Sequence, residues 1–107
     1  MSKSRILCAA LLALASCGAS PAPQFFGATR HDLRLDGIDF VVFVKGERAE
    51  VIRMGYLRRA ARDRVPALMI RAAQEASGCV VAGPAGGLHR SPSLPDDTGE
   101  ARFQLVC

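Results

Sequence analysis

The stretch TRHDLRLDGIDFVVFVKGERAEVIRMGY, residues 29–56, contains two tight-turn signals between runs in which apolar and polar residues alternate. The turn signals are Asp36-Gly37 and Gly46-Glu47. Both pairs favour the two-residue turns of β-hairpins, in which at least one residue needs a positive φ angle. The stretch therefore predicts three antiparallel strands, over residues 29–35, 38–45 and 48–56.

The two turns also determine which residues of the expected strands lie opposite one another. Leu33 faces Phe40 across the first turn, and Val42 faces Val51 across the second. One face of the sheet then collects an apolar row, which we expect to form the core: Leu33, Leu35, Ile38, Phe40, Val42, Val44, Ala49 and Val51.

The opposite face combines two kinds of residue. Some are charged, as on a solvent-exposed surface: Arg34, Asp39, Lys45, Arg48 and Glu50. Others form an apolar cluster that indicates a covered or contacting surface: Val41, Phe43, Ile52, Met54 and Tyr56. Three interpretations stay open: the loop 83–99 folds over the cluster, a partner or a second copy contacts it, or the register is misjudged.

A helix is expected after the arginine-rich connection 58–64. It begins near Arg64 or Val65, with Pro66 in its first turn, and Gly78 suits the left-handed position that ends it. Its apolar residues have helical spacing: Val65, Leu68, Met69, Ala72, Ala73 and Ala76.

Two further strands are expected around the Gly/Pro/Ser-rich loop 83–99, the first opening with Cys79-Val80-Val81 and the last over 101–107. Pairing them antiparallel brings Cys79 beside Cys107, so we expect a disulfide, which by closing a loop of about 29 residues stabilises the fold by roughly 3.6 kcal/mol. The predicted fold class is α+β, an antiparallel sheet of about five strands with one helix on one face, in the order strand-strand-strand-helix-strand-strand.

The first residues have the pattern of an export leader. Lys3 and Arg5 precede an uncharged apolar run over 6–15, which as a helix would rise only about 15 Å, half of what a hydrocarbon core requires. Ala13-Leu14-Ala15 would serve as an ordinary cleavage site that releases a soluble protein beginning at Ser16.

The next residues favour another processing route. Leu14-Ala15-Ser16-Cys17 resembles the lipobox of bacterial lipoproteins. The resemblance implies that Cys17 is diacylated on its sulfur and becomes the N-terminus, and that Gly18, where an aspartate would retain the protein at the inner membrane, directs it to the outer membrane. Cysteine arithmetic agrees, because lipidation of Cys17 leaves Cys79 and Cys107 as an even pair.

These patterns divide the chain into three parts: a signal peptide over 1–16, a lipidated cysteine with a flexible tether over 17–27, and a small domain over 28–107. The chain of 107 residues has 14 Lys and Arg against 10 Asp and Glu. Loss of Lys3 and Arg5 leaves 12 cations against 10 acids, a net charge of +2, which gives little support to nucleic-acid binding.

Residues with catalytic or metal-binding chemistry are few. Asp97-Thr98-Gly99 matches the tripeptide of aspartic proteases, but its Pro/Ser-rich context favours a simple turn. His31, expected opposite Val42 at the edge of the sheet, and His89, in the long loop, lack a second ligand at short spacing. We therefore expect no catalytic residues, no metal and no cofactor.

The connection after the third strand concentrates positive charge, and Arg58, Arg59, Arg62 and Arg64 are candidates for contact with an anionic surface. Each such cation near anionic lipid contributes about 1 kcal/mol. The alternative is a solvated connection without a partner.

Together these features predict a lipid-anchored envelope lipoprotein that faces the periplasm and acts as a non-enzymatic binding or structural module. Its expected partners are the membrane, through the anchor, and an envelope protein or a second copy, but not nucleic acid. One alternative is an accessory or inhibitor subunit of an envelope enzyme, and a further one is a minor hydrolase dependent on Asp97 or the histidines.

Overall fold

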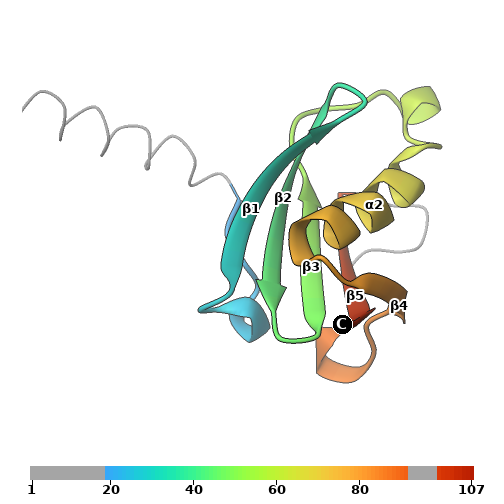
Figure 1. The fold of residues 1–107 in the computed structure, drawn as a ribbon. Helices are drawn as coiled ribbons and strands as arrows, with labels where there is room; N and C mark the ends of the chain where they lie inside the picture. The colour runs from blue at the N-terminus through green and yellow to red at the C-terminus, as the bar shows by residue number, and fades with distance from the viewer. Residues whose placement is uncertain (1–18, 92–98) are drawn as a thin grey trace, which may run out of the picture.

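The computed structural model describes residues 19–91 and 99–107 (Figure 1). Five strands form one sheet, and a single α-helix is present in the described part of the chain. The elements are β1 (Thr29–Leu35), β2 (Ile38–Lys45), β3 (Arg48–Arg53), α2 (Val65–Ser77), β4 (Val80–Pro84) and β5 (Glu100–Val106), with three short 3-10 turns, η2 (Pro23–Phe25), η3 (Arg59–Ala61) and η4 (Gly87–His89).

The α+β fold is confirmed. All neighbouring strands are antiparallel, and their order across the sheet is β1-β2-β3-β5-β4, so the last strand of the chain lies beside β3. β4 is therefore an edge strand, and α2 crosses one face of the sheet on the way to it (Figure 1). The hairpin pattern alone did not determine that β5 would lie between β3 and β4.

The predicted register of both hairpins is confirmed. Leu33 pairs with Phe40 and Val42 with Val51, as the turn lengths require. The first turn has positive φ angles at Asp36 (51°) and Gly37 (77°). The third strand is shorter than predicted, since Gly55, with a φ angle of 81°, redirects the chain soon after Arg53.

The helix also has the predicted limits. It runs from Val65 to Ser77 with Pro66 in the first turn, and Gly78, at φ 72°, donates its N–H to the carbonyl of Gln74 at 2.9 Å. Its apolar side covers the apolar row of the sheet, which we call the helix face. The buried cluster there is Leu35, Ile38, Phe40, Val42, Ala49, Val51, Val65, Leu68, Met69, Ala72, Ala73, Phe103 and Leu105.

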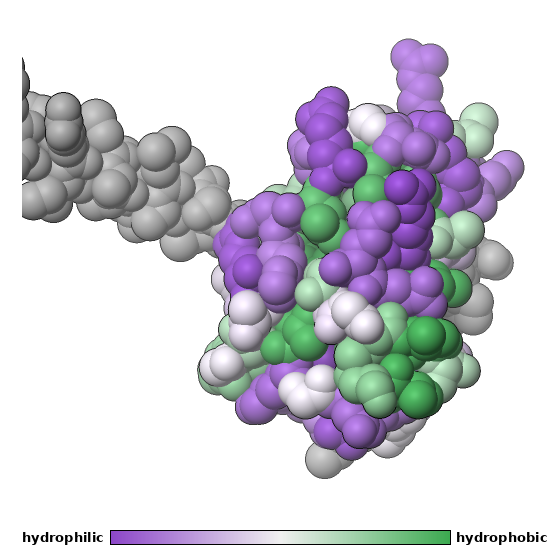
Figure 2. Space-filling model, viewed as in Figure 1, coloured by the Kyte–Doolittle hydropathy of each residue, from purple (hydrophilic) through white to green (hydrophobic). Residues whose placement is uncertain are grey.

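The predicted disulfide is present between Cys79 and Cys107, whose Cα atoms are 4.5 Å apart. It joins the start of β4 to the end of β5, which pair antiparallel. Close by, Val80 and Val106 lie opposite each other and are both largely exposed. Figure 2 shows hydrophobic atoms gathered at the lower right of the molecule, in the part of the view where Figure 1 places β4.

The opposite side of the sheet, which we call the second face, is also covered. Residues 19–27, part of the segment assigned by composition to a flexible tether, lie against it together with Ala28, and Phe25 is fully buried. The tether prediction is therefore wrong for these residues. The physical reason is that Ala19, Ala22, Phe25 and Ala28 bury apolar surface against the apolar cluster of β2 and β3.

Candidate functional site

The apolar cluster predicted as an interaction surface is mostly covered. Val41 is 3% and Phe43 4% exposed, beneath the segment that contains Phe25. Ile52 and Met54 are half-buried in the same cluster, whereas Tyr56, beyond the end of β3, is 83% exposed. The prediction of an open contact surface at Val41 and Phe43 is corrected, because the chain's own N-terminal segment occupies it.

A buried ion pair lies at the centre of the second face. Glu50 on β3 is fully buried, and its Oε2 accepts a hydrogen bond from Nε of Arg102 on β5 at 2.7 Å. Its other oxygen, Oε1, accepts from the backbone N–H of Ala22 at 3.0 Å. Sequence alternation placed Glu50 on the correct face but treated it as solvated, because neither the covering segment nor the distant Arg102 was foreseen.

Arg102 connects this carboxylate to the loop that precedes β5. Its Nη1 donates to the carbonyl of Arg90 at 2.8 Å, and its backbone N–H donates to Oγ of Ser91 at 2.7 Å. Its Nη2 donates to Oε1 of Glu100 at 3.0 Å. One guanidinium thus holds together β3, β5 and the loop.

Glu100 is a second carboxylate beside this pair. Burial raises its pKa above the ordinary value of 4.5, and the hydrogen bond and negative charge of Glu50 raise it further, while Arg102 opposes both effects. The two acids share one guanidinium, so ionisation of Glu100 is less favourable in the folded protein than in the unfolded chain. The network thus stabilises the second face by joining β3, β5, the loop before β5 and the segment that contains Ala22.

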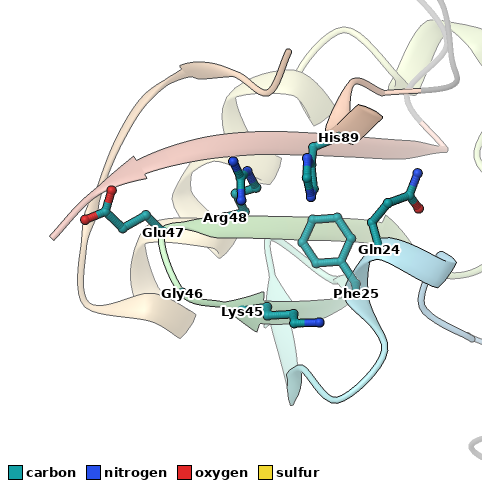
Figure 3. A pocket seen from close by; sticks show the side chains of 7 residues that line it. All are labelled: Gln24, Phe25, Lys45, Gly46, Glu47, Arg48 and His89. Atoms are coloured by element: carbon teal, nitrogen blue, oxygen red, sulfur yellow. The ribbon is translucent and has the colours of Figure 1, made fainter. Parts of the chain in front are cut away.

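A pocket of about 290 Å³ opens at one end of the second face. Figure 3 shows it between η2, the turn joining β2 to β3, and η4. The side chains around it come from three separate parts of the chain: Gln24, Phe25, Lys45, Glu47, Arg48 and His89.

Two cations of this pocket lie directly opposite each other. Lys45 and Arg48 are cross-strand partners next to the hairpin turn. Nζ of Lys45 donates to the carbonyl oxygen of Phe26 at 2.9 Å. The ring of His89 meets the ring of Phe25 edge-on, with 6.1 Å between their centroids. The sequence identified these cations only as residues of a solvated face.

The two histidines lie apart in the fold. His31 lies on the outer strand β1, opposite Val42 of β2, and belongs to the row of the helix face. His89 contacts Phe25 on the second face. Across residues 19–91 and 99–107, no group of three or more His, Cys, Asp or Glu residues is arranged to hold a metal ion. Asp97 and Cys17 lie outside the described residues.

The arginine-rich connection forms part of the hydrophilic upper surface seen in Figure 2. Arg58, Arg59 and Arg64 are exposed. Arg62 differs, because its Nε donates to the carbonyl of Leu57 at 3.0 Å and its guanidinium lies 5.9 Å from the ring centroid of Tyr56. Three of the four predicted contact residues therefore remain free to approach a surface.

Comparison with known proteins does not identify the chain. No protein-family model, curated protein or solved structure matches it. Among the residues that the structure describes, no helix is long and apolar enough to span a membrane.

Proposed function

We propose that the protein is a lipid-anchored envelope lipoprotein whose domain acts as a non-enzymatic binding or structural module. The observation that carries this proposal is Leu14-Ala15-Ser16-Cys17, placed at the end of a short apolar run that follows two cations. Two or three acyl chains on one cysteine would anchor the protein firmly, since each buried CH₂ contributes about 0.8 kcal/mol.

The use of the other cysteines supports lipidation of Cys17. Cys79 and Cys107 are joined to each other. Cys8 lies within the apolar run of the leader and would be removed with it. A mature chain that kept Cys17 unmodified would carry one unpaired thiol in an oxidising compartment, which is unusual for exported proteins.

The packing of residues 19–28 changes how such an anchor would hold the domain. Ala19 is 5% exposed in the cluster on the second face. Cys17 comes two residues before Ala19 in the sequence, and two residues span at most about 7 Å. The proposed anchor would therefore hold the folded domain close to the bilayer, without the long spacer that composition predicted.

A labelling experiment on the full chain tests the proposal. The chain is expressed in a bacterial host with radioactive palmitate, and Cys17→Ser is compared with Cys8→Ser as the matched control. We expect the wild type and Cys8→Ser to be labelled and to fractionate with membranes, and Cys17→Ser to lose the label. An unlabelled, soluble wild type that begins at Ser16 would contradict the proposal and favour ordinary cleavage.

The exposed arginines are candidates for a second, electrostatic contact with the membrane. We propose that Arg58, Arg59 and Arg64 approach anionic headgroups when the anchor holds the domain at the membrane. The full chain reconstituted in vesicles gives the test, through protection of 58–64 from trypsin. We expect stronger protection with anionic lipid than with zwitterionic lipid, weakened by salt, and equal cleavage in both would refute the contact.

A further inference from the structure

We propose that the pocket between η2, the β2–β3 turn and η4 binds a small molecule through a carboxylate or phosphate group. This inference is independent of the lipid anchor, since every side chain that it uses belongs to the described domain. It rests on the charge of the pocket, the lack of an internal counter-ion and the shape of the cavity (Figure 3).

The first step is the placement of two cations. Lys45 and Arg48 face each other across the hairpin, and like charges directly opposite in a sheet repel and destabilise the pair. Lys45 is hydrogen-bonded only to a neutral carbonyl, that of Phe26, among its described contacts. An anion between the two side chains would relieve the repulsion.

The second step is that the nearby carboxylates do not supply this anion. Glu47 lines the pocket, but Figure 3 shows its carboxylate directed away from Arg48 and His89. Glu50 follows Arg48 on the same face of β3 and is already bonded to Arg102 and the backbone of Ala22. Within the described residues the guanidinium of Arg48 has no hydrogen bond or ion pair.

The third step is the cavity itself. The guanidinium of Arg48 offers a planar set of donors that suits two oxygens of a carboxylate or phosphate at once. His89 adds a polar group beside the cavity, and the buried Phe25, against which His89 packs, fixes an aromatic wall. At about 290 Å³ the cavity is far larger than the roughly 10–15 Å³ that one water molecule needs. It therefore has room for an oxyanion group together with a small body.

Binding to the full chain in detergent tests this site by titration calorimetry and by the thermal unfolding midpoint from circular dichroism. The probes are phosphate, acetate, phenyl phosphate and phenylacetate, each at constant ionic strength against chloride. We expect saturable binding and a raised midpoint with at least one aryl probe, bound more tightly than its bare ion. If phosphate and phenyl phosphate bind more tightly than acetate and phenylacetate, the ligand carries a phosphate group. The reverse order indicates a carboxylate.

Variants assign the binding to the pocket. Arg48→Gln should weaken it tenfold or more, Lys45→Gln should weaken it by a smaller factor, and Arg59→Gln, an exposed arginine in the connection after β3, should leave it unchanged. Arg48→Lys keeps the charge without the planar donor set and should bind between Arg48→Gln and the wild type. The proposal is overturned if no probe binds more than chloride does, or if folded Arg48→Gln and Lys45→Gln bind like the wild type.

Discussion

The two faces of the sheet are covered in different ways. The helix face is closed by a regular element of 13 residues that contributes five buried side chains: Val65, Leu68, Met69, Ala72 and Ala73. The second face is closed by residues 19–28, which contribute one large buried side chain, Phe25, and by the loop held through Arg102. The buried cluster of the helix face is apolar, whereas the second face combines an apolar cluster with a buried ion pair.

This difference indicates how the two layers respond to destabilising substitutions. The helix lies between β3 and β4 in the chain and shares the main apolar cluster of the sheet, so we expect the two to unfold together. Residues 19–28 join the sheet only at β1 and can separate locally, at a cost below that of global unfolding. The hydrogen bond from Ala22 to Glu50 and the burial of Phe25 oppose that separation.

The largest expected effect contrasts two buried phenylalanines. Phe40→Ala on the helix face should lower the free energy of unfolding by about 3–5 kcal/mol, as is usual for a phenylalanine in a core. Phe25→Ala should cost less, about 2 kcal/mol, because the loss is limited by the free energy with which its segment docks. Urea unfolding followed by circular dichroism measures both.

The neighbouring Phe26 is the control for this contrast. It is 61% exposed, so Phe26→Ala should change stability by no more than about 0.5 kcal/mol. If Phe25→Ala destabilises the protein as much as Phe40→Ala, the segment unfolds together with the sheet, and the distinction between the two layers fails.

The disulfide should have the next largest effect. Cys79 packs against the cluster of the helix face, and its bond to Cys107 spans a sequence separation of 28. Replacing both with serine should lower the free energy of unfolding by roughly 3.6 kcal/mol on the loop-entropy account. Denaturant unfolding of the double variant, beside the oxidised and reduced wild type, gives the value, and equal stability of oxidised and reduced wild type would exclude this contribution.

The buried ion pair should be nearly as sensitive. Glu50→Ala leaves Arg102 buried without its closest acceptor and should cost about 3 kcal/mol. Glu50→Gln retains an oxygen that can accept from Arg102 and should cost distinctly less. Urea titration of both variants is the measurement. If Glu50→Gln loses as much stability as Glu50→Ala, the hydrogen bonds accepted by Glu50 do not account for the loss.

The smallest effect is a dependence on pH at Glu100. Because its pKa is raised above 4.5, the folded protein binds more protons than the unfolded chain just above that pH. This contribution to the free energy of unfolding is therefore present at low pH and is lost as pH rises through the raised pKa. Glu100→Gln cannot ionise, so relative to the wild type it should gain stability from pH 4 to pH 8.

Urea unfolding at several pH values measures this gain. Glu75→Gln on α2, whose side chain is 43% exposed and forms a surface ion pair with Arg71, is the control and should show a much smaller pH-dependent difference from the wild type. A constant difference between Glu100→Gln and the wild type at every pH would show that the raised pKa makes no contribution to stability.

Local signals in the sequence predicted the helix face well. Asp36-Gly37 and Gly46-Glu47 determined the register of both hairpins, and the spacing from Val65 to Ala76 predicted which side of the helix is buried. The disulfide followed from the pairing of the strands that contain Cys79 and Cys107. Each of these predictions depends on residues close in sequence or on one strand pairing.

The second face could not be predicted in the same way. Residues 19–28 have no helical or strand period, and their proline and small residues resemble a linker by composition. The pairing of Glu50 with Arg102 joins residues 52 apart in sequence. The pocket likewise requires Phe25 and His89, which irregular segments bring to Lys45 and Arg48. The one signal in the sequence for this layer was Phe25, a large apolar residue in a stretch of small residues and proline, together with an apolar cluster on the sheet that it could cover.

The central claim is that residues 19–28 are a structural layer of the domain and not a spacer. Hydrogen exchange on the full chain in detergent, resolved by residue with NMR, tests it most directly. The account predicts slowed exchange at the amides of Ala22, Phe25 and Ala28, which donate to Oε1 of Glu50 and to the carbonyls of Ala22 and Phe25. Exchange of these three amides at the rate of an unstructured peptide, while those of α2 stay protected, would contradict it.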